Sequence, residues 1–288
     1  MSFDSALFVP LAVAAFAWWL STGVVLWLIG RRPKTYSATA VAASIVGVGG
    51  VLAAIQLQDR ADVAGAYAGF AAGLACWAWH EVLFLLGYVS GPTKTVCPEG
   101  ASLKTRFKGA WDALRHHELL LAAQGALLLA LTAGSPNSMA AWTFALLWTM
   151  RLSAKLLIFF GAPRVNRGFL PDHLAYLTSF FGYGASRAAG PAIIAIVLLA
   201  ALLFISAHAA PAGGFEATAL ALLSALAALA ALEHGALYAP LGDAALWRWA
   251  TGLSDEHAKT GADGQRALGA SHQLVGKEPR AAGGESGF

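Results

Sequence analysis

Histidines and glutamates stand side by side at three places within the long apolar segments of this chain. The three pairs are His80-Glu81, His117-Glu118 and Glu233-His234. Burying an ionisable group in the hydrocarbon of a bilayer costs a few kcal/mol, so such residues usually face a partner, a cavity or a ligand inside a helix bundle. The pairs are therefore the first candidates for a functional site.

Two basic residues and a further histidine complete the candidate set. Arg151 and Lys155 are four residues apart, so they lie on one side of a helix. His173 follows in the next loop. With a helical rise of about 1.5 Å per residue, His80 and Glu81 lie roughly 10–13 Å from the nearer end of their segment. The other candidates lie near the corresponding ends of their own segments, so we expect all of them to meet at one level of the bundle.

One chemistry open to this set is metal binding. Neutral imidazole and ionised carboxylate together suit iron, zinc or manganese. The sequence contains neither HExxH nor the Glu-x-x-His pairing of di-iron bundles. Adjacent helical residues point about 100° apart, so each pair can give one ligand to a metal and the other to its surroundings. The candidate metal ligands are His80, Glu81, His117, Glu118, His173, Glu233 and His234, and the reaction would be redox or hydrolytic chemistry on a pigment precursor or a lipid.

A second chemistry is axial ligation of a tetrapyrrole, in the way that histidine holds haem iron. A bacteriochlorophyll or its precursor needs an open imidazole, a flat apolar pocket and a cation for any carboxylate. Aromatic walls are available from Trp77, Trp79, Phe84, Trp142 and Trp148. The candidate cofactor-binding residues are His80, Arg151, Lys155 and His173.

A third interpretation is purely structural. The buried glutamates pair with Arg151 and Lys155 in an ion network that fixes the helices, and the histidines make ordinary hydrogen bonds. His116, beside Arg115 at a helix start, is expected to be exposed to solvent. The residues alone do not decide among these alternatives, and whether the protein is an enzyme stays open.

The elements that must position these residues are transmembrane helices. The chain has 288 residues, of which 58% are hydrophobic and 12% charged, and its mean hydropathy is +0.61. Soluble domains contain about 25% charged residues. Since a helical crossing needs roughly 20 apolar residues, the sequence predicts an all-α integral membrane protein with seven spans, at Leu7 to Gly30, Tyr36 to Leu57, Asp62 to Tyr88, Ala113 to Ala133, Met139 to Phe160, Ala189 to Ala207 and Phe215 to Tyr238.

Basic residues in alternate loops predict the orientation. The positive-inside rule places the N-terminus outside and the C-terminus in the cytoplasm. Residues 1–252 form the membrane domain, and the polar, Gly-rich composition of 253–288 indicates a disordered cytoplasmic tail. No basic tract interleaved with aromatics indicates nucleic acid as a partner. The two cysteines, Cys76 and Cys97, form no redox motif.

Two local features carry further expectations. Gly65, Gly69 and Gly73 recur at intervals of four, which lets a neighbouring helix approach closely. Asp172 precedes an apolar run and is expected to cap a short interfacial helix that ends at Phe181.

Several motifs together are similar to the photosynthetic complex assembly protein family, PuhE, of purple bacteria. They are FAWWLSTG at 16–23, Trp79-His80-Glu81, Gly91-Pro92, CPEG at 97–100, His117-Glu118, RLSAKL at 151–156, FLPDHL at 169–174, Leu232-Glu233-His234 and AALWRW at 244–249. The resemblance implies a multi-pass protein of the bacterial inner membrane, with a role in forming the reaction centre and light-harvesting complexes or in bacteriochlorophyll supply. Its implied partners are membrane lipids, reaction-centre or light-harvesting subunits and pigment-synthesis enzymes. The resemblance implies no reaction.

Overall fold

The computed structural model describes residues 3–167, 170–182, 187–239 and 248–251, and every regular element among them is helical. The tail expected to be disordered, 253–288, lies outside the described residues. The elements are α1 (Phe3–Ile29), η1 (Pro33–Thr35), α2 (Tyr36–Gln56), α3 (Val63–Leu85), α4 (Leu103–Thr132), α5 (Met139–Phe160), η3 (Asp172–Phe180), α6 (Ala189–Ala209), α7 (Phe215–Ala236) and α8 (Arg248–Thr251).

Six of these helices, α1, α2, α3, α5, α6 and α7, are long and apolar enough to cross a membrane. The chain is therefore a multi-pass membrane protein. The segment expected as the fourth span is helical as well, but α4 does not belong to this set. Its helix begins at Leu103, ten residues before the expected start, and the polar stretch from Arg115 to Glu118 interrupts its apolar part.

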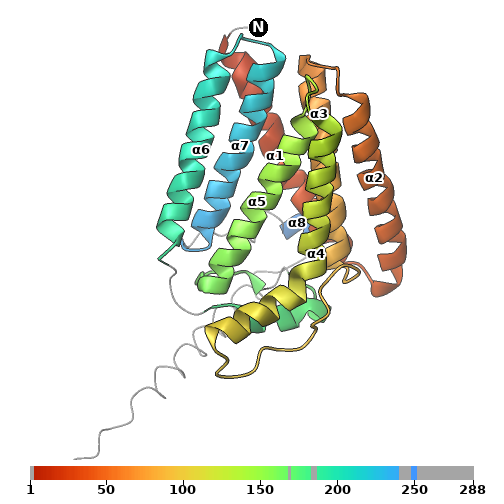
Figure 1. Cartoon of the computed structure of the whole chain (residues 1–288), viewed down its shortest axis with the longest axis vertical. Helices are drawn as coiled ribbons and strands as arrows, with labels where there is room; N and C mark the ends of the chain where they lie inside the picture. The colour runs from red at the N-terminus through yellow and green to blue at the C-terminus, as the bar shows by residue number, and fades with distance from the viewer. Residues whose placement is uncertain (1–2, 168–169, 183–186, 240–247, 252–288) are drawn as a thin grey trace, which may run out of the picture. The chain divides into compact units, whose positions relative to one another are not determined.

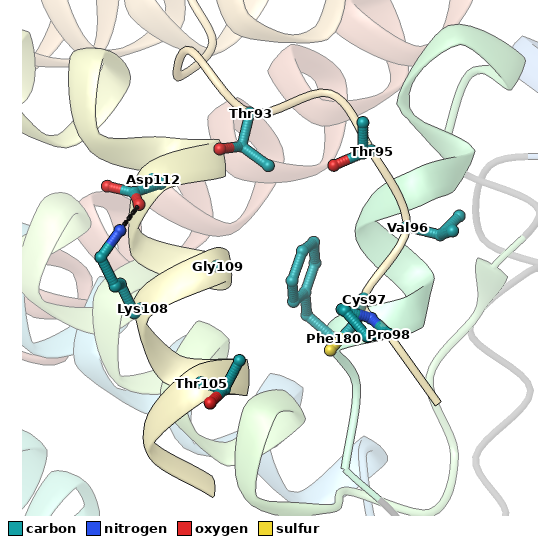
Figure 2. Close-up of a pocket in the computed structure, with 10 residues that line it drawn as sticks. All are labelled: Thr93, Thr95, Val96, Cys97, Pro98, Thr105, Lys108, Gly109, Asp112 and Phe180. Carbon is teal, nitrogen blue, oxygen red and sulfur yellow. Dashed lines mark hydrogen bonds and ion pairs between the residues drawn. The ribbon is translucent and has the colours of Figure 1, made fainter. Parts of the chain in front are cut away.

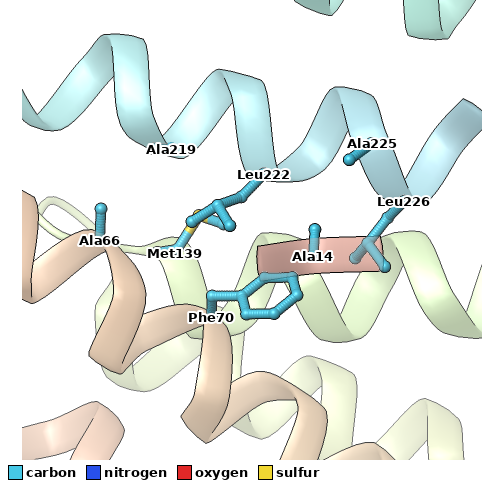
Figure 3. Packing of buried hydrophobic residues seen from close by; sticks show 8 residues of the cluster. All are labelled: Ala14, Ala66, Phe70, Met139, Ala219, Leu222, Ala225 and Leu226. Atoms are coloured by element: carbon cyan, nitrogen blue, oxygen red, sulfur yellow. The ribbon is translucent and has the colours of Figure 1, made fainter. Parts of the chain in front are cut away.

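The spanning helices pack as a bundle in which α3 lies centrally, in contact with α1, α2, α4, α5 and α7 (Figure 1). The first and last long helices, α1 and α7, also contact each other. One core cluster joins four helices, as Figure 3 shows. Its members are Ala14, Ala66, Phe70, Met139, Ala219, Leu222, Ala225 and Leu226.

Glycines let α3 approach its neighbours, as the sequence predicts. A Cβ atom at Gly73 would lie 2.7 Å from the Cβ of Thr143 in α5, and one at Gly69 would lie 2.8 Å from the Cβ of Met139. On the other side of α3, a Cβ at Gly50 of α2 would lie 2.9 Å from Cys76 Sγ. Since no side chain fits at these positions, α3 is held close to both α2 and α5.

The end of the bundle where α1, α3, α5 and α7 finish carries most of the loop arginines and lysines, and we call it the basic end. In Figure 1 the first part of α4 (yellow) lies at this end beside η3. A hydrophobic cluster joins η3 to α3 and α4. It contains Phe84, Ala113, Leu174, Leu177 and Phe180. The element η3 therefore covers the basic end of the bundle.

The short helix expected after Asp172 is present, but its start differs from the prediction. Pro171 occupies the N-cap position, and Asp172 lies in the first turn without a capping role. The element is a 3₁₀ helix that ends at Phe180. The fixed φ of proline suits a helix start, which explains why the helix does not need the Asp172 carboxylate as a cap.

Candidate functional site

Three helices bring most of the candidate residues together near the basic end. We call Glu81 of α3, His117 and Glu118 of α4, and Arg151 and Lys155 of α5 the buried polar cluster. The two glutamates and His117 are buried, whereas Arg151 and Lys155 are partly exposed. The expectation that ionisable groups from separate helices meet is confirmed for these five residues.

Glu118 is fully engaged by direct contacts. Lys155 Nζ donates a hydrogen bond to Glu118 Oε1 at 2.6 Å, and Trp148 Nε1 donates to Oε2 at 3.1 Å. Both partners belong to α5, so this carboxylate joins α4 to α5. A buried charge with a partner on each oxygen meets the requirement for burying an ion, and the arrangement stabilises the helix packing.

Glu81 is equally buried, yet its contacts are long. Its Oε1 lies 3.5 Å from His117 Nε2, and its Oε2 lies 3.9 Å from Arg151 Nη2. Strong hydrogen bonds between nitrogen and oxygen measure about 2.7–3.2 Å. Among the described residues, Glu81 Oε1 has no hydrogen-bond partner. The charge is thus balanced by its surroundings, but its hydrogen-bonding capacity is not used.

The two histidines beside Glu81 are also open. His80 packs between Trp79, whose ring centroid is 5.0 Å away, and Phe144, at 6.3 Å. His117 stacks under Phe84 at 4.4 Å. Within the described part of the chain, neither ring nitrogen of either histidine makes a hydrogen bond. The nitrogens of both imidazoles therefore lack a short hydrogen bond, although Glu81 Oε1 lies 3.5 Å from His117 Nε2 and aromatic rings occupy the faces of both histidines.

The pair on α7 belongs to a separate arrangement. His234 Nδ1 donates to the carbonyl of Ala230 at 2.7 Å, and its Nε2 lies 2.7 Å from Ser153 Oγ. Glu233 accepts a hydrogen bond of 3.0 Å from Trp18 Nε1 of α1. These residues tie α7 to α5 and α1, and they are not direct partners of the buried polar cluster.

His173 also lies apart from the cluster. Its ring packs against Tyr36 at the start of α2, with centroids 6.2 Å apart. On its other side is Gly87, where φ is +81° and an added Cβ would lie 2.9 Å from His173 Cδ2. The structure therefore places His173 where η3 meets the ends of α2 and α3, away from the other candidate ligands.

The geometry offers no metal centre in the part of the chain that the structure describes. No group of three or more His, Cys, Asp or Glu side chains is arranged there to hold a metal ion. Glu118 is already bonded to Lys155 and Trp148, and Glu233 and His234 are bonded elsewhere. The candidate ligands are thus divided among three places, so the metal interpretation gains no support.

Sequence reasoning missed two residues that lie beside candidate histidines, Gln124 beside His80 and Ser153 beside His234. Gln124 approaches His80, and its amide nitrogen is buried without a hydrogen-bond partner among the described residues. It follows His117 by seven residues, or two helical turns, which places both on one face of α4. A lone glutamine in an apolar run was the available signal. Ser153 carried none, because serines are common in membrane helices.

Two cavities lie outside the buried polar cluster. One, of about 180 Å³, lies at the basic end between the loop at Thr93–Pro98, α4 and η3, and Figure 2 shows Phe180 facing it and the Lys108–Asp112 ion pair at its α4 side. The other, of about 320 Å³, lies between the starts of α5 and α7, with Trp142 and Glu216 in its lining. Neither is lined by His80, Glu81 or His117.

The helical bundle and its buried charges define a multi-pass membrane protein with a polar site inside it. The chain belongs to the family described as protein of unknown function DUF3623, whose model matches residues 5–258. It is 36% identical over 255 residues to an uncharacterised 30.4 kDa protein in the puhA 5′ region of Rhodobacter capsulatus, covering 86% of this chain and 92% of that protein. No solved structure matches the chain.

Proposed function

We propose that this protein is a membrane assembly factor for the photosynthetic reaction centre and light-harvesting apparatus of purple bacteria. Two findings support this role. A relative is encoded in the puhA 5′ region of Rhodobacter capsulatus, and the motif set resembles a photosynthetic complex assembly family. The observation that carries the proposal is that three of those motifs, containing Glu81, His117-Glu118 and Arg151-Lys155, meet in one buried cluster.

The proposal includes a topology. Counting α4 with the six apolar helices gives seven crossings of the bacterial inner membrane, with the N-terminus outside and the basic end in the cytoplasm. The concentration of lysine and arginine at that end supports this orientation. The buried polar cluster then lies in the cytoplasmic half of the membrane, where cytoplasmic pigment-synthesis enzymes and reaction-centre subunits can reach it.

The ligand that we assign to the site is a bacteriochlorophyll-type tetrapyrrole held for delivery. The supporting feature is a pair of open imidazoles, His80 and His117, each able to give one nitrogen to a central metal. Arg151 supports the same ligand, since its side chain is 43% exposed and its guanidinium lies as far as 3.9 Å from Glu81. It can bind a carboxylate of the pigment. Entry of the macrocycle requires Phe144 or Phe84 to move from the imidazole faces.

The test is the absorption spectrum of the protein purified from a phototrophic host. Bound tetrapyrrole is expected in the wild type and lost in His80→Ala or His117→Ala. His116→Ala is the matched control, because His116 is the exposed neighbour of buried His117. The same variants are introduced into a deletion strain, where light-harvesting and reaction-centre absorbance reports assembly. Assembly at the wild-type level in the deletion strain itself contradicts the proposed role.

A second candidate function is a structural chaperone that contacts reaction-centre subunits through its helix faces. The specific observation in its favour is the directly bonded Lys155–Glu118–Trp148 group, which locks α4 to α5 and gives each oxygen of that glutamate a direct partner. This version predicts that the purified protein carries no pigment. It also predicts that His80→Ala supports assembly as long as the variant protein accumulates.

A further inference from the structure

The buried groups around Glu81 have an unusual excess of unused hydrogen-bonding atoms. Among the described residues, the buried side-chain atoms without a partner include His80 Nδ1 and Nε2, Glu81 Oε1, His117 Nδ1 and Nε2, Gln124 Nε2 and Arg151 Nε. Leaving one such atom unsatisfied costs about 1–3 kcal/mol. A bundle that left all of them unsatisfied would lose more stability than most single contacts supply, so an occupant must satisfy them.

The same atoms come from three helices. His80 and Glu81 lie on α3, His117 and Gln124 on α4, and Arg151 on α5. Glu118, by contrast, has a direct partner on each oxygen at 2.6 and 3.1 Å. Single buried atoms without a partner occur elsewhere among the described residues, at Trp77 Nε1, Arg106 Nε, Thr143 Oγ1 and Tyr176 Oη, but the residues around Glu81 contribute several such atoms together.

We infer that the Glu81 side of the buried polar cluster binds water, whereas the Glu118 side is dry. Buried water typically makes about three hydrogen bonds to groups that lack other partners. Glu81 Oε1 accepts from such water, the Gln124 amide and Arg151 Nε donate to it, and the ring nitrogens of His80 and His117 also bond to it. Ionic contacts of 3.5 and 3.9 Å fit a carboxylate whose strong hydrogen bonds go to water instead.

The inference does not depend on the assembly role. It concerns the pigment-free protein, where water fills hydrogen-bonding positions that a ligand would otherwise take. It also specifies how a ligand would enter, by displacing water from Glu81, His80 and His117 and replacing its hydrogen bonds. A ligand without hydrogen-bond donors and acceptors at those positions would bind weakly, because it could not replace the hydrogen bonds of the ordered water that it displaces.

The test is hydroxyl-radical footprinting by X-ray radiolysis, with the whole chain purified in detergent from a non-phototrophic host. Radicals formed from bound water label adjacent side chains even when these are buried. We expect His80 and His117 to be oxidised several-fold faster than His234. His234 is the matched control because it is also fully buried and has direct partners in Ser153 and Ala230.

Equal labelling of His80, His117 and His234 overturns the inference. A tetrapyrrole absorption band or stoichiometric metal in the same preparation from the non-phototrophic host also overturns it. Gln124→Leu provides the second measurement. Removing its amide takes one partner from the water, so labelling at His80 should fall while labelling at His234 stays constant. An unchanged labelling rate at His80 contradicts the inference. If the Gln124→Leu protein does not accumulate, the comparison of His80 and His117 with His234 in the wild-type protein decides the test.

Discussion

Two buried glutamates on neighbouring helices, Glu118 and Glu81, differ in the contacts that their carboxylates make. Glu118 is held by Lys155 at 2.6 Å and by Trp148 at 3.1 Å, so its charge serves to join α4 and α5. Glu81 lies 3.5 Å from His117 and 3.9 Å from Arg151, beside open imidazoles. The difference teaches that one buried network can contain a structural half, with short direct bonds, and a half whose polar groups lack such bonds.

The largest effect is expected from breaking the structural half. Lys155→Met leaves Glu118 buried with Trp148 as its remaining partner, and stranding one member of a buried pair costs about 3–5 kcal/mol. Thermal unfolding in detergent, followed by size-exclusion chromatography with fluorescence detection, measures the loss. The double variant Glu118→Gln/Lys155→Met should recover much of the stability. A double variant as unstable as Lys155→Met would contradict the pairing.

The next effect compares the two carboxylates directly. Glu118→Gln removes charge-assisted hydrogen bonds and should cost about 1.5–3 kcal/mol. Glu81→Gln has no short hydrogen bond to lose and should cost less than about 1 kcal/mol on the same principle. The midpoint of thermal unfolding distinguishes the two variants. If Glu81→Gln proves the more damaging, Glu81 belongs to the structural half.

A backbone change tests the spacing on which the Glu81–Arg151 separation depends. Gly73→Ala places a Cβ 2.7 Å from Thr143 Cβ, and overpacking of this kind costs about 1–3 kcal/mol as α3 and α5 move apart. Gly49→Ala is the control, since an added Cβ there meets nothing within 4 Å. The two variants are compared by thermal unfolding, and equal stability would show that α3 and α5 are not held at contact distance.

The smallest effect comes from Asp112, a partly exposed carboxylate in the first half of α4. The hydrogen bond from Lys108 holds the pKa of Asp112 below its usual value of 3.8, with Arg115 acting in the same direction. A carboxyl group whose pKa is lowered by folding stabilises the folded state at pH values above its pKa in the unfolded state. This contribution is lost as the pH falls through the pKa of the folded state. The stability difference between wild type and Asp112→Asn should therefore shrink below about pH 4. A constant difference would contradict the pairing.

The sequence predicted most of the bundle, because spans such as Phe215–Ala236 are continuous apolar runs of sufficient length. The start of α4 was not predictable from hydropathy, since residues before Ala113 are polar yet helical. Among the site residues, Glu81 and Glu118 were equally good candidates for every role. Their different partners depend on how each helix is rotated about its axis and on which helices lie beside it. Neither can be predicted from the pattern of a single sequence.

His173 shows the same limit from another direction. Its position in a loop at the basic end made it a plausible ligand, but η3 turns it toward Tyr36 and Gly87. The packing of Leu174, Leu177 and Phe180 against Phe84 decides that orientation. The direction of His173 can be predicted only when the surface that η3 packs against is known. Position along a helix could be predicted from sequence, whereas direction around a helix could not.

The contact between α1 and α7 has a consequence for biosynthesis. During translation α1 enters the lipid bilayer long before α7 is made. Until then α1 lacks the neighbouring helix whose Glu233 accepts the hydrogen bond from Trp18. The contact between α1 and α7 forms only when the ribosome has delivered α7. A nascent chain arrested before that point would leave the α7-facing side of α1 uncovered, where a membrane protease can recognise it.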